Sequence, residues 1–273
     1  MRVTVLGSGS RGNAILVEAG AERILVDAGF SGKDLARRMQ AVDVVPDSIT
    51  GIVITHDHGD HTRGMGVFAR RHGTPLHITH RTRDACADLL RGQETVVEYD
   101  SAVPFELGPL RIEPFLTIHD AVDPVAVTVT DTRTGSKLGV ATDLGRPTTS
   151  VRAALARSHL LVLEANHDHA RLWNGPYPWS VKQRIASSRG HLSNDASARL
   201  AAELFHDGLA AVVLAHLSDS CNDPGMAHDA VARGLDRVGY AGRLDVAAQD
   251  DPGEPMDVDA LRKAAEPHQM SLF

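Results

Sequence analysis

Aromatic side chains and cysteines are both scarce in this sequence of 273 residues. Aromatic residues make up 4% of it, whereas hydrophobic residues as a whole make up 42%. Ala, Val and Leu must therefore form most of any core. The only cysteines are Cys86 and Cys221, which lie far apart and outside any C-x-x-C pair. One disulfide can join them, but we expect two unpaired thiols in a reducing cytoplasm.

Long hydrophobic runs are absent as well. No stretch approaches the ~20 consecutive apolar residues that a membrane span needs. Residues 1–7 are typical of a strand entering a turn, and they lack the apolar region and cleavage site of a signal peptide. We therefore expect a cytoplasmic protein that does not contact a membrane.

Basic residues are fewer than acidic residues, so the chain carries a net charge of −7. This balance is unlike that of a strongly basic nucleic-acid-binding domain. Much of the excess negative charge lies in residues 245–273, where seven acidic and two basic residues give a net charge of −5. The rest of the chain, the body, therefore has a net charge near −2. Two divalent cations would more than offset the charge of the body. Net charge therefore neither excludes nor supports a polyanionic substrate.

The pattern of apolar residues predicts one mixed domain. Short β-rich segments predict strands at 2–6, 14–18, 23–26, 52–55, 76–79, 110–118, 125–130, 137–141, 160–164 and 210–215. Helical spacing and capping residues predict helices at 31–40, 62–72, 81–90, 151–156, 179–188, 195–206 and 226–238. Runs of strands followed by mixed helices favour two packed sheets with helices outside. We expect this domain to span residues 1–247, followed by a flexible acidic tail at 248–273.

The glycine-rich segment at residues 7–12 fits the G-x-G-x-x-G pattern of dinucleotide-binding folds, with Asp27 near the spacing of a ribose-binding acid. That fold needs a helix after the third glycine. Only about ten residues separate Gly12 from the strand at 23–26, too few for a crossover helix. We therefore predict a tight hairpin loop. Its polar side chains can contact an anionic substrate, and they are Ser8, Ser10 and Asn13.

The strongest signal is the sequence Thr-His-Asp-His-Gly-Asp-His at residues 55–61. In a turn from strand to helix, His56 and His58 can face one side, while Asp60 and His61 face a second centre nearby. Imidazole and carboxylate groups together suit zinc, manganese or iron. A solvated polar turn is the alternative for an isolated histidine pair, but it accounts poorly for four such groups in six positions.

Three more candidate ligands follow predicted strands. His119 comes after the strand at 110–118, Asp143 after the strand at 137–141, and His216 after the strand at 210–215. Together with the early turn they fit two divalent metal ions, zinc or manganese, bridged by the Asp143 carboxylate.

This arrangement resembles the metallo-β-lactamase superfamily over the whole body of the chain. The resemblance implies an α+β fold, a four-layer αββα sandwich with its metals at one edge. It implies that one metal is held by His56, His58 and His119. It implies that the second is held by Asp60, His61 and His216, with Asp143 between the two.

Several segments are similar to the YycJ/WalJ-type branch of that superfamily. They are residues 7–13, 26–29, 164–168, 175–179 (Gly-Pro-Tyr-Pro-Trp), 189–194 (Arg-Gly-His-Leu-Ser-Asn) and 216–218. The branch implies a DNA exonuclease that works from a 5′ end in DNA repair or maintenance. The sequence departs from the branch at residues 219–223, where Asp-Ser-Cys-Asn-Asp replaces an Asn-rich stretch.

Two further histidines are candidates near the metals. The resemblance implies that His191 protonates the leaving oxygen, because an alkoxide is a poor leaving group at neutral pH. The alternative is that His191 only braces its loop. His167 is expected to line the site or to orient a ligand. Asp60 is the other residue on which we expect turnover to depend.

A DNA substrate requires local basic residues along its path. The candidates are Arg63, Arg70, Arg71, Lys182, Arg184 and Arg189.

The chain ends in Gln-Met-Ser-Leu-Phe at residues 269–273. This peptide resembles those by which bacterial DNA-repair and replication proteins dock on the sliding clamp. Leu272 and Phe273 would fill a pocket, and Gln269 would add a polar contact.

Three functions remain open at this point. The first is a dinuclear-metal phosphodiesterase acting on DNA. The second is a small-molecule metallohydrolase using the same site on a cyclic phosphodiester, lactone or thioester. The third is a non-catalytic adaptor, against which the complete set of seven ligands argues.

Overall fold

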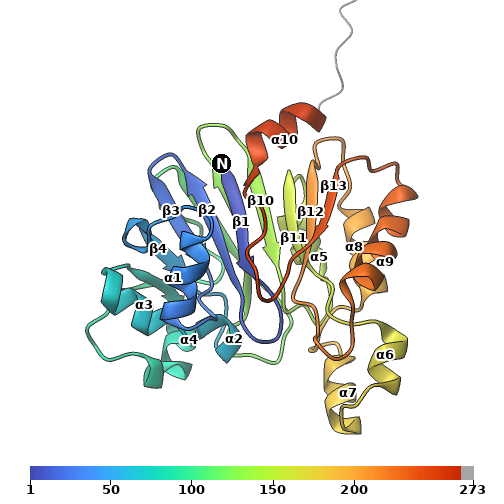
Figure 1. Ribbon diagram of the computed structural model, residues 1–273, viewed down its shortest axis with the longest axis horizontal. Coiled ribbons are helices and arrows are strands. Elements are labelled where there is room, and N and C mark those ends of the chain that lie inside the picture. The colour runs from blue at the N-terminus through green and yellow to red at the C-terminus, as the bar shows by residue number, and fades with distance from the viewer. Residues whose placement is uncertain (266–273) are drawn as a thin grey trace, which may run out of the picture.

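The computed structural model describes residues 1–265, which form two seven-stranded sheets packed face to face (Figure 1). The first sheet has the order β14 (Met256–Asp257), β1 (Arg2–Gly7), β2 (Ala14–Ala19), β3 (Glu22–Val26), β4 (Gly51–Val53), β5 (Leu76–Thr79), β6 (Val96–Tyr99). The second has the order β13 (Arg243–Val246), β12 (Ala211–Ala215), β11 (Leu160–Glu164), β10 (Lys137–Ala141), β9 (Val125–Asp131), β8 (Leu110–Leu116), β7 (Phe105–Leu107).

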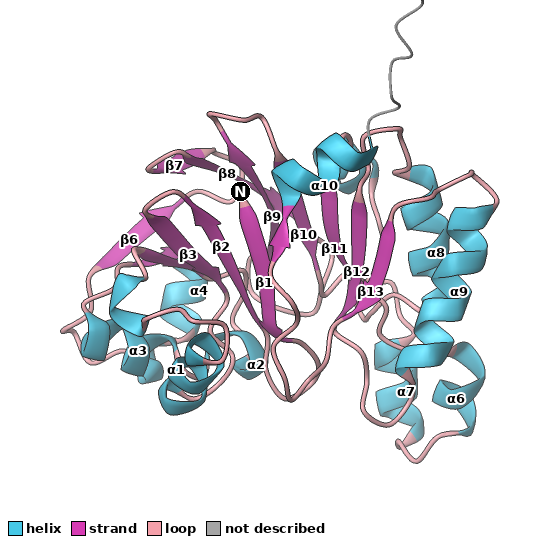
Figure 2. Ribbon diagram, turned by 45° about the horizontal axis from the view of Figure 1, so that its top comes forward, coloured by secondary structure: helices cyan, strands magenta, loops and turns pink. Residues whose placement is uncertain are grey.

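Helices cover the outer faces of both sheets (Figure 2). The first sheet is covered by α1 (Gly32–Gln40), α3 (Met65–His72) and α4 (His80–Ala85), and the short α2 (Gly59–Thr62) lies at its edge. The second is covered by α5 (Thr149–Leu155), α8 (Asn194–Glu203) and α9 (Pro224–Asp236). Short 3-10 turns occur at Pro46–Ser48 and Ala87–Leu89. This arrangement confirms the expected αββα sandwich. Two short helices, α6 (His169–Asn174) and α7 (Trp179–Ile185), extend beyond it at one end.

The alternation of side chains along the strands builds three separate cores. In β3, Ile24 and Val26 point into the core between the sheets, whereas Leu25 joins the core beneath α1 and α3. In β11, Val162 faces the inner core and Leu163 faces the helices of the second sheet. Successive residues of a strand face opposite sides, so strands buried on both faces are apolar throughout. Aliphatic residues dominate all three cores, as the scarcity of aromatic residues predicted.

The glycine-rich segment at residues 7–12 connects two antiparallel neighbours, β1 and β2. It is therefore a hairpin loop, as predicted, and not the phosphate-binding turn of a dinucleotide fold.

The acidic C-terminal segment corrects one expectation. We expected a flexible tail from residue 248, but β14 pairs with β1, with Val3 opposite Met256. Met256 and Val258 are buried in the core between the sheets, and the helix α10 (Val258–Ala265) follows. The acidic and proline-containing composition hid two apolar residues that complete a sheet edge. The folded domain thus continues past residue 247 to residue 265. The peptide containing Gln269, Leu272 and Phe273 lies outside the described residues.

Within residues 1–265, no helix combines the length and apolarity needed to cross a bilayer.

Strand direction determines where polar side chains gather. β10, β11, β12 and β13 run parallel, and so do β3, β4, β5 and β6. The carboxyl ends of parallel strands meet at one edge of a sheet, where ligands commonly bind. The loops after β4, β10, β11 and β12 therefore converge beside α2 (Figure 1).

Candidate metal centre

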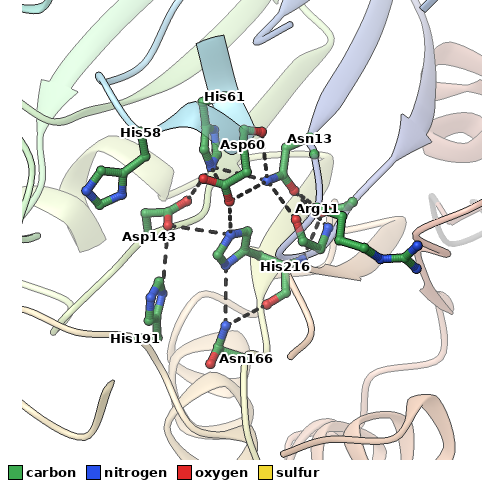
Figure 3. Close-up of polar contacts among 12 residues, drawn as sticks. Arg11, Asn13, His58, Asp60, His61, Asp143, Asn166, His191 and His216 are labelled. Atoms are coloured by element: carbon green, nitrogen blue, oxygen red, sulfur yellow. Dashed lines mark hydrogen bonds and ion pairs between the residues drawn. The ribbon is translucent and has the colours of Figure 1, made fainter. Parts of the chain in front are cut away.

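The seven predicted ligands come together at this edge, and Figure 3 shows five of them, namely His58, Asp60, His61, Asp143 and His216. One cluster consists of His56, His58, His119 and Asp143, and a second consists of Asp60, His61 and His216. A third group, Asp143, Glu164, His191 and His216, shares one member with each of these two clusters. Within each cluster the candidate ligand atoms all lie within 4.8 Å of one another. Such spacing allows one cation to contact all members of a cluster.

The Asp143 carboxylate lies close to histidines of both clusters. Its Oδ2 lies 3.1 Å from Nε2 of His61, and its Oδ1 lies 3.6 Å from Nε2 of both His119 and His216. The carboxylate therefore faces histidines of both groups at once.

Hydrogen bonds hold the histidine rings with Nε2 toward the centre. Nδ1 of His61 donates to Asp27 Oδ2 at 2.7 Å, and Nδ1 of His119 donates to the carbonyl of Gly190 at 3.1 Å. Because these partners can only accept, the proton resides on Nδ1 and the Nε2 lone pair is left for a ligand.

His56 provides a test of whether the residues present fit a cation. Thr55 Oγ1 gives its only hydrogen to Asp27, so it accepts from Nδ1 of His56, 3.0 Å away. Nε2 of His56 is then a buried acceptor with no hydrogen-bond partner among residues 1–265. An unsatisfied buried polar atom is unfavourable, and a cation at this position would satisfy it. The donor set therefore fits divalent metal ions.

The electrostatics of the carboxylates also suit metal ligands. Burial alone would raise the pKa of Asp60, but the neighbouring imidazoles of His61 and His216 outweigh it and lower the pKa. For Asp143 too, burial would raise the pKa, but the imidazoles of His216 and His61 outweigh it, and the pKa lies well below the ordinary value. Burial, reinforced by His61, lowers the pKa of His56. Ionised carboxylates and a neutral imidazole are the forms that bind metals.

The backbone is strained at three positions beneath the site. Asp27, Asp143 and His216 have φ values of 64°, 57° and 55°, in the left-handed region that non-glycine residues seldom adopt. Each such residue costs about 1–3 kcal/mol and persists where its surroundings impose it. Asp27 and His216 directly follow a strand, and Asp143 comes two residues after one. The tight turn at each position therefore directs the side chain into the site.

Close packing fixes α2 in place. The backbone N–H groups of Asn13 and Ala28 donate to the carbonyls of Asp60 and His61, each at 2.8 Å. A Cβ on Gly29 would lie 1.7 Å from the carbonyl oxygen of Asp60, so only glycine allows this approach. The segment at residues 26–29 thus positions the metal-ligating turn.

Glu164 is a functional residue that sequence reasoning missed. It ends β11, is fully buried, and its Oε1 accepts from Nδ1 of His191 at 2.8 Å and from Nδ1 of His216 at 3.1 Å. Its other oxygen accepts the backbone N–H groups of Leu144 and Leu192. Burial would raise the pKa of Glu164, but these imidazoles and hydrogen bonds lower it to about 2. A carboxylate at the end of an otherwise apolar strand was the available signal.

His191 lies beside the clusters, as expected. Its ring centroid is 5.0 Å from that of His119 and 5.2 Å from that of His216. Burial lowers its pKa, but the Glu164 carboxylate more than compensates and raises it. His191 thus sits at the wall of the site with its Nδ1 proton directed to Glu164.

His167 does not line the pocket in the part of the chain that the structure describes. Its side chain is buried, its carbonyl accepts the backbone N–H of Asn194, and burial lowers its pKa to about 4. The preceding residue, Asn166, does line the pocket and lies against His216. An expected substrate contact at this loop therefore fits Asn166 better than His167.

The three polar residues of the glycine-rich loop differ in position. Ser8 donates to Asn13 Oδ1 at 2.7 Å and accepts the backbone N–H of His216 at 2.8 Å, and both Ser8 and Asn13 are buried. They support the ligand-bearing segments from behind. Ser10 is exposed and lines the pocket, so it alone of the three is open to a substrate.

The pocket over the clusters has a volume of about 240 Å³. Its walls come from the metal clusters on one side and from α7 on the other. The lining residues are Ser10, His58, Asp60, Asp120, Asp143, Asn166, Tyr177, Val181, Arg184, Ile185, Gly190, His191, His216 and Ser218.

The six basic candidates for DNA contacts lie on or near two helices, and of the six only Arg184 lines the pocket. On or just after α7 lie Lys182, Arg184 and Arg189. On or near α3 lie Arg63, Arg70 and Arg71. Arg184 lines the pocket and is paired with Asp120, whereas Arg70 is tied to Glu94.

Comparison with known proteins places this site in a family. Residues 22–217 match the model of the beta-lactamase superfamily domain. The chain is also 32% identical over 242 residues to exodeoxyribonuclease YycJ of Bacillus anthracis, with 88% of this chain and 91% of that protein covered. The chain belongs to the metallo-β-lactamase superfamily. Its identity to exodeoxyribonuclease WalJ of Streptococcus pneumoniae is again 32%, over 83% of this chain and 85% of that one. These matches confirm the YycJ/WalJ-like branch.

A solved structure shows the same fold. The metallo-beta-lactamase fold protein YhfI from Bacillus subtilis superposes with a TM-score of 0.70 at 20% identity, covering 92% of this chain and 98% of that one. The family and the donor clusters together confirm the expectation of a metal-dependent hydrolase.

Proposed function

We propose that this member of the superfamily is a dinuclear-metal phosphodiesterase that removes nucleotides from the 5′ end of DNA, in repair or maintenance. The observation that carries the proposal is the pair of donor clusters with Asp143 between them. The identity of 32% to two proteins named exodeoxyribonucleases favours DNA over other phosphodiesters.

Two divalent ions, zinc or manganese, fit the donor set. His56, His58 and His119 would hold one, Asp60, His61 and His216 would hold the other, and Asp143 would contact both. When bound, such ions supply Lewis acidity toward a phosphate and a water molecule whose pKa falls to about 7.

The protein's own groups bind the substrate and move a proton. Ser10 and Asn166 line the pocket, where a hydroxyl and an amide can bind phosphate oxygens. His191 directs its Nδ1 proton to Glu164, which leaves Nε2 to carry the proton that the departing oxygen needs. Glu164 also orients His216, so one buried carboxylate aligns both imidazoles.

Metal analysis combined with a nuclease assay tests the proposal. Wild-type protein should bind two equivalents of metal and shorten 5′-labelled and 3′-labelled oligonucleotides in a 5′ to 3′ order. Asp60→Ala should stay folded, retain about half of the metal and lose nearly all turnover, because only one cluster remains intact. The matched control is Asp219→Ala, at an exposed surface position. Asp57 is nearer in the sequence and belongs to neither cluster, but its side chain accepts the backbone N–H of Val122, so it is a poorer control.

Two outcomes would contradict the proposal. Hydrolysis of bis-p-nitrophenyl phosphate without any cleavage of DNA would favour the small-molecule hydrolase. Full metal occupancy without turnover on either substrate would favour a non-catalytic adaptor.

We also propose that residues 269–273 dock on a sliding clamp. The support is the sequence alone, with Gln269, Leu272 and Phe273 as the contact residues. Deleting residues 268–273 should abolish binding to purified clamp while DNA cleavage by the free enzyme persists. Unchanged clamp binding would remove the proposal.

A further inference from the structure

The helices α6 and α7, with the loop between them, concentrate the few aromatic residues of the chain. Both tryptophans of the sequence, Trp173 and Trp179, lie here, together with Tyr177, one of its three tyrosines. We call residues 169–189 the α6–α7 segment. It extends beyond the sandwich at the same end as the metal centre (Figures 1 and 2).

The segment holds an indole ring open to solvent. Trp179 has 64% of its surface exposed, a large fraction for an apolar side chain of this size. Its ring centroid is 5.1 Å from that of Trp173, at an interplanar angle of 45°. Trp173 is itself fixed, because its indole N–H donates to His169 Nε2 and its carbonyl accepts from Lys182 Nζ. The exposed ring therefore stands on a rigid support.

The segment is continuous with the metal pocket. Tyr177, Val181 and Arg184 line the same cavity as Asp143 and His191. A chain whose terminal phosphate lies at the clusters would contact these residues, because they form one wall of the pocket. Pro176 and Pro178 flank Tyr177 and limit the conformations of the loop that carries it.

The charge of the segment is opposite to that of the whole chain. Residues 169–194 contain no aspartate or glutamate, although the net charge of the protein is −7. The same range contains four basic residues, Arg171, Lys182, Arg184 and Arg189, of which Arg184 is paired with Asp120 outside the range. An aromatic surface with a local excess of positive charge matches a single-stranded polynucleotide, whose bases stack and whose phosphates are anionic.

We propose that the α6–α7 segment is a stacking platform, on which Trp179 and Tyr177 hold the unpaired bases of a single-stranded DNA end beside the metal centre. This inference rests on the proposed nuclease function and specifies its substrate. Every base has a π face, so stacking accepts any sequence, as an enzyme that removes successive nucleotides requires. A groove that read base edges by hydrogen bonds would be selective instead.

Intrinsic fluorescence of the metal-loaded, full-length protein tests the platform directly. Trp173→Phe leaves Trp179 as the only indole in the sequence. The probes are a phosphorothioate oligo(dT), which resists cleavage, and an abasic oligomer of equal length and charge. Oligo(dT) should quench the emission of Trp179, whereas the abasic oligomer should not. The abasic oligomer should also bind about tenfold more weakly for each of the two bases that Trp179 and Tyr177 would stack.

Matched variants separate stacking from charge. Trp179→Ala should weaken binding of oligo(dT) by about tenfold, Trp179→Phe should restore most of the affinity, and neither should change binding of the abasic oligomer. Val45→Ala removes another exposed apolar side chain, 63% exposed and on the first sheet's side, and should have no effect.

The outcomes distinguish this inference from the proposed function. Equal binding of the two oligomers, or equal binding of single strands and blunt duplex, would overturn the platform while leaving a DNA enzyme. No binding of any oligonucleotide by the wild-type protein would overturn both.

Discussion

Asp27 accepts a hydrogen bond from Nδ1 of His61 at 2.7 Å, directly beneath the metal-ligating turn. The same carboxylate accepts the backbone N–H and the hydroxyl of Thr55. One buried side chain from the end of β3 thus fixes the tautomer of one ligand and the start of the turn that carries the others. Groups that orient metal ligands in this way affect affinity almost as strongly as the ligands do.

Asp27→Asn should therefore lower metal affinity in the cluster that contains His61. An amide keeps the shape but provides one acceptor in place of two, so the ring loses its fixed orientation. We expect a loss of affinity of about 10- to 100-fold, measured by competition with a metal-binding dye. Asp43→Asn is a matched control, because Asp43 is exposed and has a similar φ of 58°. Equal affinity of Asp27→Asn and wild type would contradict this role.

His191→Gln should impair poor substrates more than good ones. DNA releases an alkoxide, which needs a proton, whereas bis-p-nitrophenyl phosphate releases a phenolate that needs none. If His191 supplies the proton, kcat on DNA should fall by about 10²- to 10⁴-fold and kcat on the activated ester should change little. A histidine that only braces the loop would reduce both rates together. His228→Gln, in α9 and partly exposed, serves as the control.

Glu18→Gln should make stability less dependent on pH. Glu18 lies between Arg2 and Arg23 at 2.7 and 3.0 Å. Burial raises its pKa, but the two guanidinium groups outweigh burial and lower it. A carboxyl whose pKa is lowered by folding stabilises the protein above its unfolded pKa of about 4.3, and this contribution is lost as the pH falls through the folded value.

The variant should thus be less stable than wild type at neutral pH, by roughly 1 kcal/mol after allowance for solvent screening. The difference should shrink toward zero in acid, at a pH below the lowered folded pKa of Glu18. Urea unfolding at both pH values provides the measurement. Glu106→Gln, an exposed strand glutamate, should show no such pH-dependent gap. A gap for Glu18→Gln that persisted at low pH would exclude the ionic origin.

Val258→Ala should destabilise the fold, because Val258 is fully buried between the sheets. Removing two buried methyl groups is expected to lower the free energy of unfolding by about 1–3 kcal/mol. Val238→Ala, at a residue that is 36% exposed, should cost far less. Equal stability of Val258→Ala and wild type in urea would mean that the segment does not contribute to the core in solution.

The sequence alone predicted the residues that form the donor clusters, because the evidence for them is local. His56, His58, Asp60 and His61 lie within six positions, and the other three each follow a recognisable apolar strand. Parallel strands carry such positions to one edge whatever the intervening loops contain. The order of strands and helices along the chain is also local information, and it predicted two packed sheets with helices outside.

What escaped prediction depends on contacts between distant segments. Glu164 acts on His191 and His216, which lie 27 and 52 positions away, and nothing in its own strand indicates these partners. β14 is only two residues long, too short to show an alternating pattern, and forms because β1 offers a free edge. Tertiary pairing of this kind overrides a local composition that is typical of a flexible tail.

The position of α10 determines how the proposed clamp contact and the proposed DNA substrate would be arranged around the folded domain. The helix ends at Ala265, at the end of the sandwich opposite to α2, α6 and α7 (Figure 1). Under the proposed function, a clamp bound to residues 269–273 would be connected to the folded domain at Ala265, at the end opposite to the metal centre. Clamp binding and DNA cleavage would then use opposite ends of the folded domain.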